Sequence, residues 1–278
     1  MKAAVIGTPI AHSKSPILHN AAYTALGIGN SWNYTKFEVD ENSLGEFMRQ
    51  LDNSWAGFSV TMPLKQAVIA HLDEISTEAM QTNAVNTVII QPDKSRPQKL
   101  HLTGYNTDIY GIEQAFCEAS TPEKHQALQG GAIVLGSGAT ARSAVSALKK
   151  LLLNSSAQKI TVISRKKAPW IQQAKLDWCS FDERARINAL VDSSKYAVST
   201  LPWDAAKLLL PTIFHQSFPL LLECAFPKVL DFSIGGERML IHQAVLQVQL
   251  MIKCEKRNID VKKTTEVMTT ALQKWEEG

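Results

Sequence analysis

The stretch that most constrains the fold of this chain runs from Gly131 to Lys167. An apolar run at 132–135 stops at a glycine-rich turn, 136–138, which leads into a sequence whose apolar residues recur with helical spacing. A second apolar run at 160–163 follows and ends in polar residues. Strand, glycine turn, helix and strand in this order predict the βαβ unit of a dinucleotide-binding domain.

The residues of the turn suit the binding of a pyrophosphate. Gly136 lets the chain turn sharply out of the strand, and Gly138 has no Cβ, so a phosphate group can approach the backbone. Ala141 occupies the third position, where the helix must lie close to the strand. The start of the helix offers N–H groups and the positive end of its dipole to the phosphates. The alternative is a glycine turn in another kind of α/β unit.

The end of the second strand distinguishes between the two nicotinamide cofactors. An NAD site requires a carboxylate there for the ribose hydroxyls, whereas this chain has Ser164, Arg165, Lys166 and Lys167. A 2′-phosphate would meet a hydroxyl donor and cations, and an arginine can bind a phosphate through two parallel hydrogen bonds. We interpret Arg165 as a cofactor residue and Lys167 as a solvated surface lysine. The sequence therefore favours NADP over NAD.

Length and composition bound the class of protein. The chain has 278 residues, enough for about two domains, and 45% of them are apolar and 20% charged, as in soluble globular proteins. The net charge of +3 and the lack of basic blocks argue against a nucleic-acid partner. With no run of about 18 apolar residues and no apolar leader at its start, the chain is expected to have neither a membrane span nor a signal peptide.

The spacing of cysteines and histidines adds two expectations. The four cysteines form no closely spaced pair and are typical of reduced thiols in a cytoplasmic protein. The seven histidines show no metal-ligand spacing, so we expect no metal site. We expect a small-molecule substrate as the partner and a chain that acts as a monomer or a homodimer. The scattered tryptophans are interpreted as packing residues.

Residues up to about 110 alternate between predicted strands and helices, which indicates crossover connections and a largely parallel sheet. After the first strand, Ser15 is predicted to be the N-cap of a helix that ends at Gly27. After the third strand, Pro63 fits the first turn of another helix, which would place Lys65 near that helix's N-terminus.

The polar residues of this region follow the predicted strands, and Asn86 is expected inside the strand at 84–90. Because ligands bind at the carboxyl ends of strands in such sheets, these side chains are expected to gather on one rim. They form a candidate pocket for a small polyhydroxylated acid. The rim residues are Ser13, Ser15, Thr61, Lys65, Asn86, Asn106, Thr107 and Asp108.

The rest of the chain completes the predicted architecture. A helix at 109–118 and a linker at 120–126 lead into the dinucleotide domain, whose later strands are expected at 196–200 and 220–226. Two further helical patterns, about 236–253 and 261–275, have apolar faces that need a partner, and we place them on the first domain. The expected fold is α/β, with a mostly parallel substrate domain (1–108 and about 240–278) and a Rossmann-like domain (109–239).

Six stretches together resemble the shikimate dehydrogenase family over nearly the whole length of the chain. They are GTPIAHSKSPILHNAAY near the start, SVTMPLK at 59–65, NAVNTV at 83–88, GYNTD at 104–108, GSGATARSAV at 136–145 and MLIHQAVLQ at 239–247. The resemblance implies reversible, NADP-dependent reduction of 3-dehydroshikimate to shikimate, a step toward chorismate and the aromatic amino acids.

The family's functional positions transfer to matching residues of this sequence. The resemblance implies a catalytic pair, Lys65 and Asp108. It implies substrate binding by Ser13 and Ser15 at the carboxylate, with hydroxyls held by Thr61, Asn86 and Gln243. It implies cofactor binding by Gly136, Gly138, Ala139, Ser164, Arg165 and Lys166, with Met239 near the nicotinamide.

The chemistry explains why the pair needs these residue types. Hydride addition to a ketone builds negative charge on the carbonyl oxygen, and a proton donor within hydrogen-bond reach lowers the barrier. Lys65 can act as this donor and recover the proton in the reverse direction. Asp108 can hold the adjacent hydroxyl and keep Lys65 oriented and charged.

The chain departs from the family's pattern in places. Phe226 stands where the family has a tyrosine that touches substrate, and about a dozen residues are missing before Gly235. Ser59 replaces an asparagine, and Tyr105 an aspartate. Two alternatives therefore stay open: a sister enzyme acting on quinate or a related acid with NAD, and a member of the fold that binds ligands without turnover.

Overall fold

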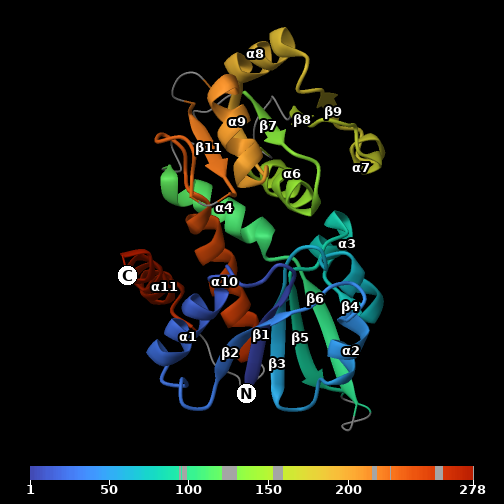
Figure 1. Cartoon of the computed structure of the whole chain (residues 1–278), viewed down its shortest axis with the longest axis vertical. Helices are drawn as coiled ribbons and strands as arrows, with labels where there is room; N and C mark the ends of the chain where they lie inside the picture. Colours follow the sequence, from blue (N-terminus) through green and yellow to red (C-terminus); the bar gives the residue numbers. More distant parts are fainter. Residues whose placement is uncertain are drawn as a thin grey trace. The chain divides into compact units, whose positions relative to one another are not determined.

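The computed structural model describes residues 1–93, 95, 99–120, 130–152, 159–214, 218–225, 227–253 and 259–277. The chain forms two compact units, Met1–Thr107 with Ile241–Gly278, and Asp108–Leu240. The chain passes from one unit to the other after Thr107 and again within helix α10 (Gly236–Ile252). The expected α/β architecture is confirmed, and Figure 1 shows the elements of each unit.

The first unit is built on a sheet with strand order β2-β1-β3-β5-β6-β4. Its strands are β1 (Lys2–Gly7), β2 (Asn33–Glu38), β3 (Trp55–Val60), β4 (Glu74–Ile75), β5 (Thr87–Pro92) and β6 (Leu100–Tyr105). The sheet is mostly parallel as expected, but β5 runs antiparallel to β3 and to β6.

The position of Asn86 differs from the sequence-based expectation. Asn86 lies just before β5, not inside a strand. Because β5 runs against its neighbours, its first residues lie beside the last residues of β3 and β6, with Thr87 paired to Ser59 and Tyr105. Asn86 therefore reaches the same rim as the carboxyl ends of the parallel strands.

The helices of this unit differ from the expectation at the start of the first helix. The described helical elements before residue 107 are α1 (Ser15–Ala25), α2 (Leu44–Arg49), the 3₁₀ helix η1 (Ala67–His71) and α3 (Thr77–Thr82). Lys14 is the N-cap of α1 and Ser15 its first helical residue, so the prediction that Ser15 caps the helix is wrong. The predicted stop at Gly27 is confirmed, because its φ of +71° is the left-handed conformation that glycine adopts most readily.

The segment that carries Lys65 is a turn, not the start of a helix. It is closed by a hydrogen bond from Leu64 N to Thr61 O at 2.9 Å, and η1 begins only at Ala67. The fully buried side chains of Leu64 and Val68 anchor the turn in the core. Val85 N donates to Lys65 O at 2.8 Å, so the backbone of Lys65 lies beside the residue that precedes Asn86.

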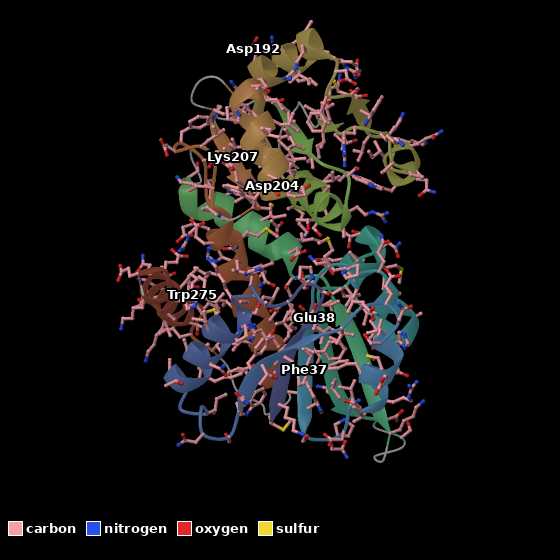
Figure 2. All side chains as sticks on the ribbon, viewed as in Figure 1. Phe37, Glu38, Asp192, Asp204, Lys207 and Trp275 are labelled. Atoms are coloured by element: carbon pink, nitrogen blue, oxygen red, sulfur yellow. The ribbon has the colours of Figure 1, made fainter. Side chains whose placement is uncertain are left out.

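Both C-terminal helices pack on the first unit, as expected from their apolar faces. Helix α11 (Val261–Glu277) packs against α1, as Figure 1 shows. Near its end, Glu276 lies 3.2 Å from the Lys14 ammonium, which also lies 4.9 Å from the centre of the Trp275 ring. Figure 2 labels Trp275 on this helix. These contacts thus hold Lys14, which lies between the predicted substrate residues Ser13 and Ser15.

The second unit is a parallel sheet with strand order β11-β10-β7-β8-β9. Its strands are β7 (Gly131–Leu135), β8 (Ile160–Ile163), β9 (Asp177–Cys179), β10 (Ser194–Ser199) and β11 (Leu220–Glu223). Its described helices are α4 (Asp108–Ala119), α6 (Ala139–Leu151), α7 (Pro169–Gln173), α8 (Arg184–Ser193) and α9 (Trp203–Ile213). The predicted strand, glycine turn, helix and strand are β7, the turn at 136–138, α6 and β8.

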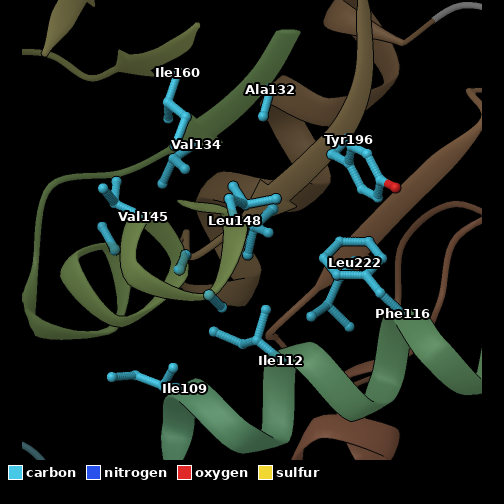
Figure 3. Packing of buried hydrophobic residues seen from close by; sticks show 14 of the residues in the cluster. Ile109, Ile112, Phe116, Ala132, Val134, Val145, Leu148, Ile160, Tyr196 and Leu222 are labelled. Carbon is cyan, nitrogen blue, oxygen red and sulfur yellow. The ribbon is translucent and has the colours of Figure 1, made fainter. Parts of the chain in front are cut away.

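One hydrophobic cluster of this unit lies between the sheet and the helices α4 and α6 (Figure 3), and a second one joins the sheet to α8 and α9. Ile112 and Phe116 of α4, Leu148 of α6 and Val134 of β7 are fully buried. Phe116 meets the Tyr196 ring edge to face, at 5.5 Å between centroids. The predicted apolar face of α6 is confirmed by this burial.

A buried carboxylate organises the segment after β11. Glu223 is fully buried and accepts hydrogen bonds from Val229 N at 2.8 Å, from Leu230 N at 2.9 Å and from Ser233 Oγ at 2.5 Å. Ile234 then forms a bridge to Leu222. The expected strand to residue 226 ends at Glu223, and Phe226 lies outside the described residues.

Candidate functional site

The glycine turn of the second unit has the backbone that the motif predicts. Gly136 has φ of +107°, and a Cβ at this position would collide with Thr200 Oγ1. Thr200 Oγ1 is fixed by donating to Leu135 O at 2.8 Å, and Gly136 N donates to Ile163 O at 2.9 Å. Only glycine therefore fits where the chain leaves β7.

Gly138 and the start of α6 form an open cradle. Gly138 is the N-cap of α6, has no side chain to bond the first N–H groups, and a Cβ built on it meets nothing within 4 Å. Ala139 is the first residue of the helix. Uncapped N–H groups with open space before them fit a phosphate group. The residues present therefore suit the pyrophosphate of a dinucleotide.

The loop after β8 carries the expected cations on its surface. Arg165 and Lys166 are exposed, whereas the Ser164 side chain is buried. Ser164 Oγ donates to Lys166 O at 2.8 Å and accepts a hydrogen bond from Trp178 Nε1 at 3.0 Å. In this arrangement Ser164 shapes the loop, and Arg165 and Lys166 face solvent together with the neighbouring Lys167.

Met239, expected near the nicotinamide, lies on α10 and belongs to the buried core of the second unit. Its side chain is 8% exposed.

Among the described residues, no group of three or more His, Cys, Asp and Glu side chains is placed to hold a metal ion. None of the helices in the described ranges has the length and apolar character of a membrane span.

In the first unit, Asn86 is the centre of a buried cluster of amides and hydroxyls. Its Oδ1 accepts from Thr107 N at 2.8 Å, and its Nδ2 lies 3.0 Å from Thr107 Oγ1 and 3.4 Å from Gln243 Oε1. Asn86 is 2% and Gln243 7% exposed. Two residues expected to bind substrate, far apart in the sequence, therefore contact each other through their side chains.

Gln247, one helical turn after Gln243, extends this cluster and was not among the residues predicted from the sequence. Its Nε2 donates to Thr87 Oγ1 at 2.9 Å and to Asn86 O at 3.3 Å. Ser59 Oγ donates to Gln247 Oε1 at 2.9 Å. The spacing of two glutamines four residues apart in MLIHQAVLQ is the one signal in the sequence that could have indicated it.

Tyr34 and Ser59 connect this cluster to Ser15. Tyr34 OH donates to Ser59 Oγ at 2.6 Å. Burial raises the pKa of the Tyr34 phenol, and hydrogen bonds with Ser59 and Ser15 act in the opposite direction. Ser59 is thus part of a buried hydrogen-bond network that reaches two of the predicted substrate residues.

His19 closes the network on its buried side. It is fully buried, stacks on Tyr34 at 3.9 Å between ring centroids, and shares a hydrogen bond of 3.1 Å between its Nε2 and Gln247 Oε1. Because an amide oxygen only accepts, Nε2 carries the proton. Burial lowers the pKa of His19 to about 3, and the bond to Gln247 offsets only part of this effect. His19 therefore has a polar contact with Gln247 in addition to its packing against Tyr34.

The low pKa of His19 predicts a loss of stability at mildly acidic pH. The unfolded chain takes up a proton at His19 near pH 6.5, whereas the folded chain resists this to about pH 3. Stability is therefore complete above pH 6.5 and falls as the pH drops below it, by about 2 kcal/mol between pH 7 and pH 5.

Urea unfolding at both pH values measures this effect in the unaltered chain and in His19→Gln. His19→Gln is expected to lack that part of the pH dependence, and the exposed His12→Gln serves as the matched control. An unchanged pH dependence in His19→Gln would show that the histidine does not contribute it.

The other predicted residues lie as follows. Ser15 is buried, and Ser13, Thr61 and Lys65 are half-buried. Ser13 Oγ lies 3.4 Å from the backbone N–H of Ser15, which orders the turn before α1. Asp108 is 5% exposed and begins α4, directly after Thr107, whose N–H bonds Asn86.

Residues 5–88 of the first unit match the family model described as the shikimate dehydrogenase substrate binding domain. Among curated proteins, the chain is 30% identical over 280 residues to the pentafunctional AROM polypeptide of Candida glabrata, covering 90% of this chain and 17% of the relative. The chain thus spans about one sixth of the length of the curated relatives it matches.

A solved structure matches over nearly the full length of both chains. The shikimate 5-dehydrogenase of Mycobacterium fortuitum is 30% identical, with a TM-score of 0.75 and coverage of 97% of this chain and 97% of that one. The chain belongs to the shikimate dehydrogenase family. The family resemblance inferred from the six motifs is therefore confirmed.

Two further members of the shikimate dehydrogenase fold were solved with different cofactors. The enzyme of Thermus thermophilus, in complex with NADP(H) and shikimate, is 24% identical with a TM-score of 0.74 and covers 98% of this chain and 99% of that chain. The enzyme of Listeria monocytogenes, in complex with shikimate and NAD, is 20% identical with a TM-score of 0.72 and 96% coverage of each. At these identities the likeness shows the fold alone, so the cofactor of this chain must be argued from its own residues.

Proposed function

We propose that this chain is an NADP-dependent oxidoreductase that reversibly reduces 3-dehydroshikimate to shikimate, on the route to chorismate and the aromatic amino acids. The observation that carries the proposal is the buried cluster in which Asn86, Thr107 and Gln243 contact one another. In a shikimate dehydrogenase family member, such a fixed set of amides and hydroxyls suits a ligand with several hydroxyl groups. We expect the enzyme to act in the cytoplasm as a monomer or homodimer.

Each substrate residue has a role that its chemistry supports. The hydroxyls of Ser13 and Ser15 would hold the substrate carboxylate at the start of α1. Asn86 and Gln243, held in one orientation by their mutual contact, would bind ring hydroxyls together with Thr61. A fixed orientation lowers the entropy lost on binding.

Lys65 and Asp108 would carry the proton chemistry. Lys65 would donate a proton to the carbonyl oxygen as negative charge develops there, and recover it in the reverse reaction. Asp108 would hold the hydroxyl next to that carbonyl. The turn that holds Lys65 is anchored by the buried Leu64, which limits its motion.

The cofactor residues are those of the open cradle and the loop after β8. Gly136, Gly138 and Ala139 would receive the pyrophosphate, and Arg165 and Lys166 the 2′-phosphate. Ser164 would act by shaping that loop, and Met239 would lie near the nicotinamide. The bound NADPH supplies the hydride.

The proposal is tested by following absorbance of the reduced cofactor. The purified chain is given shikimate with NADP⁺, and separately quinate with NAD⁺. Reduction of NADP⁺ with shikimate supports the proposal. Turnover with quinate and NAD⁺ alone would assign the chain to the sister activity, and binding of NADPH and shikimate without turnover would assign it a ligand-binding role.

Arg165→Ala is expected to weaken NADP⁺ binding about 10- to 100-fold, because a hydrogen bond to a charged group is worth about 1.5–3 kcal/mol. NAD⁺, which lacks the 2′-phosphate, should bind as before. Lys167→Ala is the matched control, since Lys167 is exposed in the same loop and we assign it no cofactor contact. Isothermal titration calorimetry checks the prediction, and equal losses for both cofactors would contradict it.

A further inference from the structure

Two tryptophans of the second unit donate their indole N–H groups to the two segments assigned above to the cofactor. Trp170 Nε1 donates to the backbone oxygen of Ser137 at 2.9 Å, in the middle of the glycine turn. Trp178 Nε1 donates to Ser164 Oγ at 3.0 Å, at the start of the loop that carries Arg165. The sequence had indicated only packing roles for the tryptophans.

Trp170 fixes the orientation of a peptide group in the turn. The C=O and N–H of a trans peptide point in opposite directions, so holding Ser137 O also sets the direction of the Gly138 N–H. The Trp170 ring is held in turn by the guanidinium of Arg142, whose Cζ lies 5.5 Å from the ring centre. Arg142 lies in the first part of α6, the helix that the turn begins. Trp170 therefore connects α7 to the phosphate-facing end of α6.

Trp178 acts on the second loop through Ser164. The Ser164 hydroxyl has one proton, which it donates to Lys166 O at 2.8 Å, and it accepts the indole proton of Trp178. The bond to Lys166 spans Arg165 and sets the curvature of the loop that presents its guanidinium. Loss of the indole donor would leave that hydroxyl less firmly oriented.

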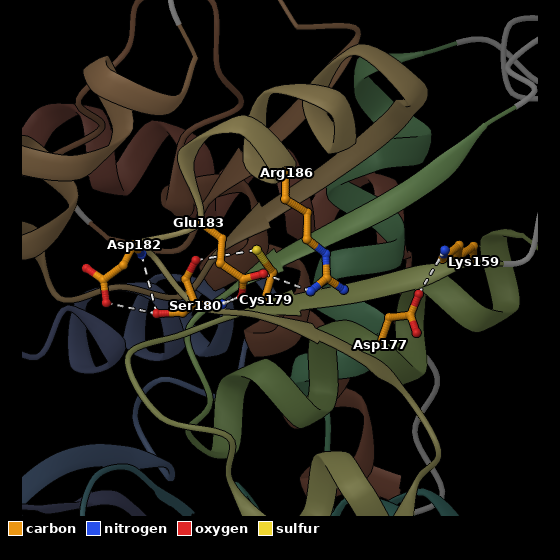
Figure 4. A network of polar contacts seen from close by, with 7 residues as sticks. All are labelled: Lys159, Asp177, Cys179, Ser180, Asp182, Glu183 and Arg186. Carbon is orange, nitrogen blue, oxygen red and sulfur yellow. Dashed lines mark hydrogen bonds and ion pairs between the residues drawn. The ribbon is translucent and has the colours of Figure 1, made fainter.

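The strand that carries Trp178 is itself held at both ends. Strand β9 pairs with β8, and its last residue, Cys179, accepts from Ser164 N at 3.1 Å. At its first residue, Asp177 forms an ion pair with Lys159 at 2.9 Å. After its last residue, the backbone N–H of Ser180 donates to Glu183 at 2.7 Å. Figure 4 shows the Lys159–Asp177 ion pair and the contacts of Ser180 and Glu183.

We propose that Trp170 and Trp178 are positioning residues that divide the recognition of NADP between them. Trp170 orients the turn for the pyrophosphate, which NAD and NADP share. Trp178 orients the loop for the 2′-phosphate, which only NADP carries. This inference rests on the proposed function, since it assigns these segments to a nicotinamide dinucleotide.

The test measures binding of NADP⁺ and NAD⁺ to the full chain by isothermal titration calorimetry. Trp170→Phe, which removes the N–H donor and keeps an aromatic ring, is expected to weaken both cofactors by about 3- to 10-fold. Trp178→Phe is expected to weaken NADP⁺ by about 3- to 10-fold and to leave NAD⁺ unchanged. Trp203→Phe, at a partly exposed tryptophan on α9 of the same unit, is the matched control and should change neither.

A second variant separates positioning from general damage to the unit. Ser164→Ala should reproduce the selective loss of NADP⁺, and adding Trp178→Phe to it should cause no further loss if the indole acts through that hydroxyl. Additive losses, or equal losses of both cofactors in Trp178→Phe, would overturn the division of roles. An unaltered chain that binds neither cofactor would overturn the proposed function along with it, whereas normal binding in all variants would overturn this inference alone.

Discussion

Replacing Lys65 with methionine is expected to lower kcat for shikimate oxidation by about 10²- to 10⁴-fold, the usual contribution of general acid–base catalysis. Methionine keeps most of the side chain's length and apolar stem but cannot donate or accept the proton. The backbone around position 65 should persist, because it is held by the Val85 to Lys65 main-chain bond and by the buried Leu64.

Steady-state kinetics with NADP⁺ check this prediction, with circular dichroism to verify the fold. Lys2→Met, at an exposed lysine on β1 of the same unit, is the matched control and should retain full activity. A kcat for Lys65→Met close to that of Lys2→Met would remove Lys65 from the catalytic mechanism. Asp108→Asn is the companion variant, because it keeps the size of the side chain while removing the carboxylate of the other proposed catalytic residue.

Glu223→Ala is expected to cause a large loss of stability, about 3 kcal/mol, since it leaves two backbone N–H groups and the Ser233 hydroxyl without their acceptor. In a protein of this size such a change corresponds to a Tm lower by about 6–12 °C. Thermal unfolding measures it. Glu223→Gln should lose less, because it keeps one acceptor oxygen, but it should still be destabilised because its amide N–H group faces one of the donors.

The exposed Asp192 of α8 offers a matched control within the same unit (Figure 2). Asp192→Ala also removes a carboxylate, but this carboxylate is exposed and is not the acceptor of a buried donor. The Tm of this variant should therefore stay near that of the unaltered chain. A Glu223→Ala variant as stable as this control would contradict the assigned role. The expected loss would show that Glu223 holds the segment at 229–234 against β11.

The local sequence determined much of the structure of the second unit. Glycine at position 136 is required by a positive φ and by the nearness of Thr200, and both follow from a strand that turns directly into a helix. The apolar runs at 132–135 and 160–163 form parallel strands because they are short, buried on both faces and separated by a helix. In contrast, the short strand β9 and helix α7 were not predicted, since segments of three and five residues carry too little periodicity.

In the first unit, local sequence patterns predicted two features of the secondary structure wrongly. An apolar run around residues 84–90 predicted a strand that includes Asn86, but tertiary pairing starts the strand at Thr87 and reverses its direction. Likewise Pro63 fits the first turn of a helix by its own φ, yet the buried Leu64 and Val68 keep this segment as a turn. In both cases packing and ladder hydrogen bonds outweighed local preference.

By itself, the sequence determined the family, the two domains' architecture and the motifs whose residue types suit a nicotinamide cofactor and a polyhydroxylated acid. Only the tertiary structure decided which side chains meet, because contacts such as Asn86 with Gln243, Ser59 with Gln247 and Trp178 with Ser164 join segments that leave no periodic trace. The physical reason is that a buried polar group must find its hydrogen-bond partner wherever the fold brings one, not at a fixed distance along the chain.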